Sequence, residues 1–132
     1  SLPPYVPREI RSLRLVAADD ELDYHLKYAD RSALARLLQR RDDCDEILIV
    51  RDGAITATSY SNGAFFDGRK YVTPDTFLLN GTRRQYLLGT GVLTERRITP
   101  SDLGGFERVV LINAMLGIED DLAVPIERIR GL

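Results

Sequence analysis

Two Asp-Gly pairs, each lying between short apolar and β-branched runs, are the feature that most restricts how this chain can fold. The pairs are Asp52-Gly53 and Asp67-Gly68. Asp-Gly between such runs favours a two-residue β-hairpin, because both central residues of the preferred turn need positive φ. The middle of the chain is therefore predicted to be a meander of three or four antiparallel strands. The predicted strands are 46–51, 54–60, 63–66 and 70–73.

One amphipathic segment lies before these strands. Its apolar residues recur at helical spacing, Asp30 suits the N-cap, and two arginines suit the negative end of the helix dipole. This pattern predicts a helix of about eleven residues over 30–41, the one long helix of the chain. The apolar stripe consists of Ala33, Leu34, Leu37 and Leu38.

The remaining segments add strands and short helices to this framework. Apolar patterning predicts strands over 10–16, 92–98 and 107–113, and an edge strand with irregular chain over 117–132. Thr82 to Gln85 has capping-box spacing and predicts a short helix, and Thr99-Pro100 opens one helical turn. The predicted fold class is α+β, a sheet-rich domain over 10–132 that curls into a partial barrel. Residues 1–9, which contain three prolines, form an extended leading segment.

Composition excludes several classes of function. A net charge of −2 and a pI near 5.4 disfavour a nucleic-acid partner. No apolar run is long enough to span a membrane. A single cysteine, Cys44, fits a reducing compartment, so a cytoplasmic location is expected. One cysteine and one histidine exclude a zinc site of the Cys/His kind, and no metal is expected.

Lysine is rare in this arginine-rich chain. Of the 18 basic residues, only Lys27 and Lys70 are lysines, and arginine cannot form a Schiff base. Lys27 precedes the Asp30 cap and lies between aromatic and apolar neighbours, where partial burial would favour a neutral, nucleophilic amine. The same surroundings also suit a lysine that reaches from a helix start into solvent. Local context leaves both interpretations open.

Three further segments could contact a ligand. Asn80 to Arg83 places backbone amides at a helix start, which is either a plain cap or an anion site. Asn113-Ala114-Met115 follows a buried strand and is either a turn or a ligand-facing loop. The polar run 59–62 is either a solvated strand face or part of a site.

Taken together, four stretches resemble one family, the class IV aminotransferase-type proteins that use pyridoxal phosphate. The resemblance is to their C-terminal domain, is closest in the branch of 4-amino-4-deoxychorismate lyase, and covers about 11–126. The four stretches are 26–31 (LKYADR), 56–62 (TATSYSN), 78–84 (LLNGTRR) and 111–115 (LINAM).

The resemblance implies a role for each matched residue. Lys27 would be catalytic and would bind the cofactor as a Schiff base. Thr82 and Arg83, after Gly81, would offer backbone amides to the cofactor phosphate. Asn113, Ala114 and Met115 would form a second phosphate-contacting loop. Ser61 and Asn62 would line the face of the cofactor ring.

Two departures from the family pattern affect the expected activity. Ala57 stands where the family usually has an acidic residue that pairs with the pyridine nitrogen. The family also has a smaller N-terminal domain, and here only 1–9 precede the matched region. Impaired catalysis by this chain alone is therefore expected.

The expected function is the cofactor-binding half of a lyase that forms 4-aminobenzoate and pyruvate. A branched-chain or D-amino-acid transaminase is one alternative, and a non-catalytic family member is the other. A small-molecule substrate and a homodimer are the expected partners, because an uncovered apolar face favours self-association.

Overall fold

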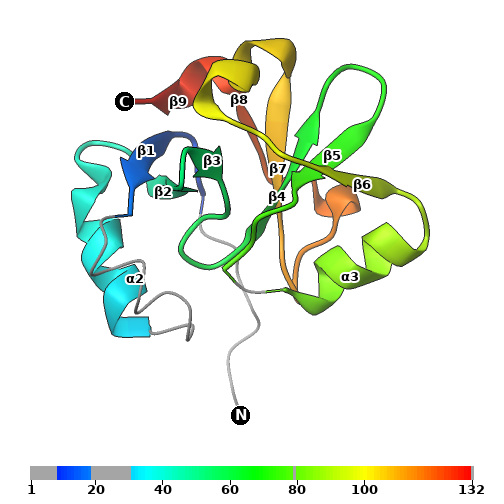
Figure 1. Cartoon of the computed structure of the whole chain (residues 1–132), viewed down its shortest axis with the longest axis horizontal. Coiled ribbons are helices and arrows are strands. Elements are labelled where there is room, and N and C mark those ends of the chain that lie inside the picture. The colour runs from blue at the N-terminus through cyan, green and yellow to red at the C-terminus, as the bar shows by residue number, and fades with distance from the viewer. Residues whose placement is uncertain (1–8, 19–30, 79, 132) are drawn as a thin grey trace.

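Two β-sheets pack around a shared apolar core in the computed structural model, which describes residues 9–18, 31–78 and 80–131 (Figure 1). Sheet one has the order β3-β2-β1-β9, and sheet two has the order β6-β5-β4-β7-β8. Sheet one comprises β1 (Leu13–Ala17), β2 (Glu46–Arg51), β3 (Ala54–Ile55) and β9 (Ile129–Arg130). Sheet two comprises β4 (Asn62–Phe66), β5 (Tyr71–Pro74), β6 (Leu93–Arg96), β7 (Arg108–Ile112) and β8 (Ala123–Pro125).

The central strands are apolar on both faces because each sheet packs against the other sheet on one face and against a helix on the opposite face. In β2, Leu48 and Val50 point into the core between the sheets, while Ile47 and Ile49 pack under a helix. In β7, the residues at 109 and 111 face the core, and those at 110 and 112 face a second helix. Continuous apolar runs are typical of strands buried on both faces.

In the part of the chain that the structure describes, two α-helices cover the outer faces of the sheets (Figure 1). α2 (Arg31–Leu38) continues as the 3₁₀ turn η1 (Gln39–Arg41), which confirms the predicted helix up to Arg41. α3 (Thr82–Gly89) packs Leu87 against sheet two. Three shorter 3₁₀ turns follow: η2 (Pro100–Gly105), η3 (Ile118–Asp120) and η4 (Ile126–Arg128). The result is the predicted mixed α+β domain, whose sheets curl as a half barrel.

The predicted antiparallel meander is only partly right. The Asp52-Gly53 turn forms, with positive φ at both residues, and β4 pairs with β5 around Asp67-Gly68. However, β3 ends at Ile55, and β4 belongs to the other sheet. The cause is a bulge, because the Thr56 amide and the Ala57 carbonyl both bond to Ile49. The chain leaves sheet one there and crosses to sheet two.

Other predictions hold with shifted boundaries. β8 and β9 are edge strands within the predicted 117–132 tail. The start of α3 differs from the prediction, because its N-cap is Gly81 and Thr82 is the first helical residue, without a capping side chain. Among the described residues, no helix is both long and apolar enough to span a bilayer. Most of the predicted leading segment (1–8), Asp30 and Lys27 lie outside the described residues.

Candidate functional site

A cavity of about 430 Å³ opens where four segments far apart in sequence meet. These segments are α2, the crossing between the two sheets, the start of α3, and the turn after β7. The described residues that line it are Leu34, Ala57, Thr58, Ser59, Tyr60, Ser61, Asn62, Leu78, Asn80, Gly81, Thr82, Asn113, Ala114 and Met115.

Strand register explains why these segments converge. β4 and β7 are antiparallel, and Asn62 at the start of β4 pairs with Ile112 at the end of β7. The residues just before β4 therefore lie beside the turn that follows β7. Asn62 and Ala64 share one face of β4, and Ala64 lies in the cluster that packs α3.

The structure brings together most of the residues singled out in the sequence. Ser61, Asn62, Gly81, Thr82, Asn113, Ala114 and Met115 all line the one cavity, and so does Ala57. The predicted adjacency of the α3 start and the Asn113–Met115 turn is thus confirmed. Lys27 lies outside the described residues, so its position relative to the cavity stays a prediction.

Arg83 differs from the rest of the predicted set. It lines a shallower depression of about 310 Å³ together with Tyr86, and this depression shares Thr82 and Ala114 with the main cavity. The Arg83 guanidinium lies 3.9 Å from the carboxylate of Glu119. Only its backbone amide, at the start of α3, belongs to the same end of the helix as Thr82.

Backbone amides gather at the start of α3. The Gln85 amide donates to the Gly81 carbonyl at 3.0 Å, so the amides before it lie in the first turn and point towards the helix N-terminus. The partial positive charge of that end favours an anion. Gly81 also allows the Asn62 side chain to lie very close to the helix start, because a Cβ at Gly81 would lie 2.6 Å from Oδ1 of Asn62.

The hydrogen-bonded turn from Thr58 to Ser61 forms the wall of the cavity between the two sheets, here called the cross-sheet wall. Thr58 Oγ1 accepts from the Ser61 amide at 3.0 Å and lies 2.6 Å from Ser61 Oγ. The Ser59 amide donates to Oε1 of Glu46 at 2.9 Å, and the Ser59 hydroxyl also bonds to that oxygen. Glu46 is fully buried at the start of β2 and so anchors this wall to sheet one. Neither Glu46 nor Thr58 was identified from the sequence.

The side chain of Asn113 closes the turn after β7. Asn113 and Leu116 exchange two backbone bonds of 3.0 and 3.1 Å, and the Met115 amide donates to Asn113 Oδ1 at 2.8 Å. The Met115 amide is thus engaged within the turn. Ala114, at its tip, has a small side chain and borders both the cavity and the depression.

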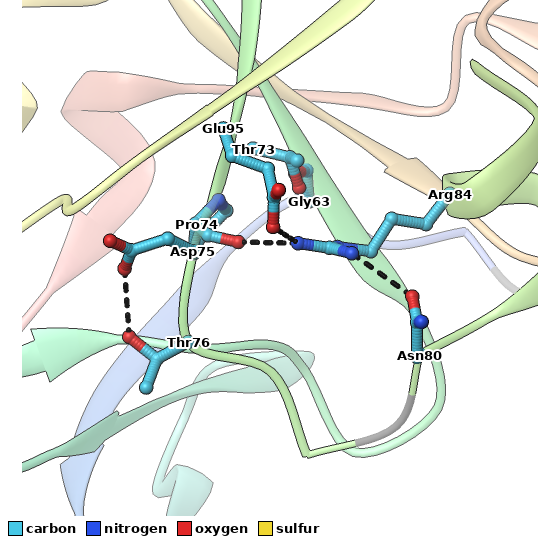
Figure 2. Close-up of polar contacts among 8 residues, drawn as sticks. All are labelled: Gly63, Thr73, Pro74, Asp75, Thr76, Asn80, Arg84 and Glu95. Atoms are coloured by element: carbon cyan, nitrogen blue, oxygen red, sulfur yellow. Dashed lines mark hydrogen bonds and ion pairs between the residues drawn. The ribbon is translucent and has the colours of Figure 1, made fainter. Parts of the chain in front are cut away.

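Arg84 is a third residue that the sequence did not identify. It is only 2% exposed, and its guanidinium donates to Asn80 Oδ1 and the Pro74 carbonyl at 3.0 Å each and to Glu95 at 2.5 Å (Figure 2). It also lies 4.4 Å from the centre of the Phe77 ring. The capping-box spacing of 82–85 predicts a helix but does not indicate this burial. Its burial depends on partners distant in sequence.

The donor set of the cavity suits a phosphorylated, largely apolar ligand. The described lining residues include no carboxylate, and they offer amide and hydroxyl groups beside a helix N-terminus. A cavity of this size falls within the usual range for small-molecule sites. The absence of a side chain at Gly81 lets the Asn62 amide oxygen pack against the helix start. The residues present therefore fit a group such as pyridoxal phosphate.

Solved structures and curated proteins resemble this chain. A crystal structure from Haemophilus somnus 129PT, provisionally identified as a 4-amino-4-deoxychorismate lyase, is 37% identical with a TM-score of 0.76, and the match covers 86% of this chain and 58% of that one. An uncharacterized Haemophilus influenzae protein is 42% identical over 86% of this chain and 60% of its own length. The chain thus spans about three-fifths of each relative.

More distant structures share the fold. A Brucella abortus aminotransferase, whose structure holds the cofactor pyridoxal phosphate, is 19% identical with a TM-score of 0.72, over 100% of this chain and 51% of that one. Residues 8–120 match the family described as amino-transferase class IV, whose members bind pyridoxal phosphate. The chain belongs to the class IV aminotransferase family.

Proposed function

We propose that this chain is the cofactor-binding part of a pyridoxal-phosphate-dependent lyase similar to 4-amino-4-deoxychorismate lyase. The observation that supports this proposal is the convergence of three of the four family-like stretches on one cavity. The likeness to the Haemophilus somnus protein favours the lyase over the transaminases of the family, because that relative is more similar in sequence than the Brucella abortus aminotransferase.

The start of α3 would hold the cofactor phosphate. The amides of Thr82 and Arg83 lie in the first helical turn, before the first intrahelical donor, Gln85. Ala114 borders the same space from the other side and would complete the phosphate contacts. Backbone donors fixed by a helix bind an anion without a loss of side-chain conformational entropy, so they would orient the cofactor firmly.

The cross-sheet wall would orient the cofactor ring. Ser61 and Asn62 are buried where they line the cavity, and the Glu46–Ser59 contact holds the preceding turn. Lys27 would hold the cofactor covalently through its side-chain amine. When bound, pyridoxal phosphate supplies an electron sink for bond cleavage at the substrate carbon.

A non-catalytic member of the family is the second candidate, and Ala57 favours it. Ala57 is 5% exposed and lines the cavity with a methyl group. If the pyridine nitrogen lies beside it, no anionic partner keeps that nitrogen protonated, and the sink is weaker. Such a protein would bind the cofactor and turn over substrate slowly or not at all.

The test of cofactor attachment uses the two lysines as a matched pair. The chain is mixed with pyridoxal phosphate, reduced with borohydride and mapped by peptide mass spectrometry. We expect the pyridoxyl group on Lys27, its loss in Lys27→Arg, and its retention in Lys70→Arg. Attachment at Lys70 or at the amino terminus would overturn the site assignment.

A second measurement separates the candidate activities. The loaded chain is supplied with 4-amino-4-deoxychorismate, and the release of 4-aminobenzoate and pyruvate is followed. Release supports the lyase proposal. Amino-group transfer from branched-chain or D-amino acids without this release supports the transaminase alternative. Cofactor attachment without either reaction supports the non-catalytic candidate.

A further inference from the structure

We propose that Asn80 is a ligand-binding residue of the cavity, and that buried Arg84 turns the Asn80 side-chain amide so that its nitrogen is the group offered to a bound phosphate. This inference rests on the proposed function and adds a side-chain donor to the backbone donors of α3. The sequence pattern alone indicates no role for the Asn80 side chain.

Arg84 occupies a fixed position. Its side chain is 3% exposed, and its guanidinium contacts the end of β5, β6 and the loop before α3 at once (Figure 2). Glu95 balances its charge, and the Phe77 ring covers one face. A guanidinium held by a carboxylate, a carbonyl and an aromatic ring has little freedom to rotate.

The chemistry of arginine then decides which way the Asn80 amide points. A guanidinium only donates hydrogen bonds, so the Asn80 atom 3.0 Å from it must be the oxygen. The amide nitrogen must therefore point away from Arg84. The Asn80 backbone carbonyl is also engaged, because the Gln85 side chain donates to it at 2.7 Å. Both oxygens of Asn80 thus serve the protein, and the –NH₂ group is the part of the side chain available to a ligand.

The position of Asn80 gives that donor a target. Asn80 is exposed, lines the cavity and directly precedes Gly81, the N-cap of α3. In the proposed arrangement, its amide nitrogen faces the same mouth of the cavity as the backbone amides of the helix start. A neutral two-proton donor beside those amides suits an oxygen-rich anion, which is the phosphate of the cofactor or free phosphate.

Asn80→Asp separates binding from folding. The aspartate keeps an oxygen for Arg84 and adds an ion pair, so the melting temperature should be unchanged or higher. It replaces the donor with a negative charge, so we expect at least about a tenfold loss of affinity for both pyridoxal phosphate and inorganic phosphate. Gln39→Glu is the matched control, because it makes the same change of charge at an exposed residue of η1 outside the cavity lining. It should change either affinity less than about twofold.

A second variant tests the positioning role of Arg84. Arg84→Lys keeps the charge but loses the planar fork that holds Asn80. In the folded protein, Arg84→Lys should weaken phosphate binding. The further loss of phosphate affinity caused by Asn80→Asp should be smaller in the Arg84→Lys protein than in the unsubstituted chain. A role of Arg84 in folding only would lower the melting temperature and leave the affinity of the folded protein unchanged.

The outcomes distinguish this inference from the proposed function. Folded Asn80→Asp that binds both probes as tightly as the unsubstituted chain overturns the inference. Weaker phosphate binding in Asn80→Asp, without any cofactor attachment at Lys27 in the unsubstituted chain, supports the inference and overturns the proposed function. An unsubstituted chain that binds neither probe overturns both.

Discussion

At the scale of single residues, the cavity depends on a few close contacts rather than on its size. Gly81 is conformationally ordinary, with φ of −60°, so its small size is what the site needs. It lies against the buried side chain of Asn62, where even a methyl group would be too close. The start of α3 and the start of β4 are in this way packed directly against each other.

Gly81→Ala should disturb the site more than the fold. The added Cβ would lie 2.6 Å from Asn62 Oδ1, so Asn62 or the helix start must move. We expect a loss of about 1–3 kcal/mol in the free energy of unfolding and a clear loss of affinity for pyridoxal phosphate. Chemical denaturation and a spectroscopic cofactor titration measure the two effects.

Gly89→Ala in the same helix is the control for that prediction. A Cβ at Gly89 meets nothing within 4 Å, so the variant should gain up to about 1 kcal/mol from helix propensity and bind normally. A Gly81→Ala protein with unchanged stability and unchanged affinity would show that the close approach to Asn62 has no importance.

At the scale of secondary-structure elements, side-chain caps fix the short turns that connect strands of sheet two. In η2, Asp102 Oδ2 accepts from the Thr99 amide at 2.9 Å and from the Thr99 hydroxyl at 3.1 Å. These hydrogen bonds, above all the one from the Thr99 amide, lower the pKa of Asp102 below its ordinary value. Asp67 caps the β4–β5 turn in a similar way, since its Oδ1 accepts from the amides of Lys70 and Arg69.

Asp102→Ala should therefore destabilise the protein in a pH-dependent way. A lowered pKa in the folded state means that the ionised carboxylate stabilises the fold at pH values above its ordinary pKa of 3.8. That contribution is lost as the pH falls through the lower folded pKa. The melting temperature of Asp102→Ala should be lower than that of the unsubstituted chain at neutral pH, and the gap should close in acid.

Thermal melts across this acidic range make the measurement, with Glu127→Ala as the control. Glu127 is an exposed residue of η4, and its removal should change the melting temperature little at any pH. A gap between Asp102→Ala and the unsubstituted chain that stays constant down to strong acid would contradict the prediction.

At the scale of the whole molecule, large apolar side chains are exposed beside the candidate site. Met115 is 59% exposed and lines the cavity, and Tyr86 is 63% exposed beside the adjoining depression. Exposed apolar groups gathered near one site are typical of an association surface. We therefore predict a homodimer through this face.

Light scattering tests the dimer. We expect a dimer for the unsubstituted chain and a shift towards monomer in Tyr86→Lys, because a charge would be buried at the interface. Val92→Lys is the matched control, since Val92 is 45% exposed and lines neither the cavity nor the depression. A strict monomer at high concentration would contradict the prediction.

The sequence by itself determined the local elements of this protein. The two Asp-Gly turns, the helical segment up to Arg41 and the apolar run of β7 all follow from interactions between residues a few positions apart. The same near-neighbour patterns located the segments that line the cavity, including the glycine before α3 and the turn after β7.

Only the tertiary structure decided how these pieces are joined. The parallel pairing of β1 with β2 and β9, the bulge at Thr56 and Ala57 opposite Ile49, and the burial of Arg84 all depend on distant partners. A local pattern cannot reveal such partners, because a strand edge bonds to any complementary strand and a guanidinium is normally solvated. Arg84 is buried because Glu95, Pro74 and Asn80 together replace the water that it loses.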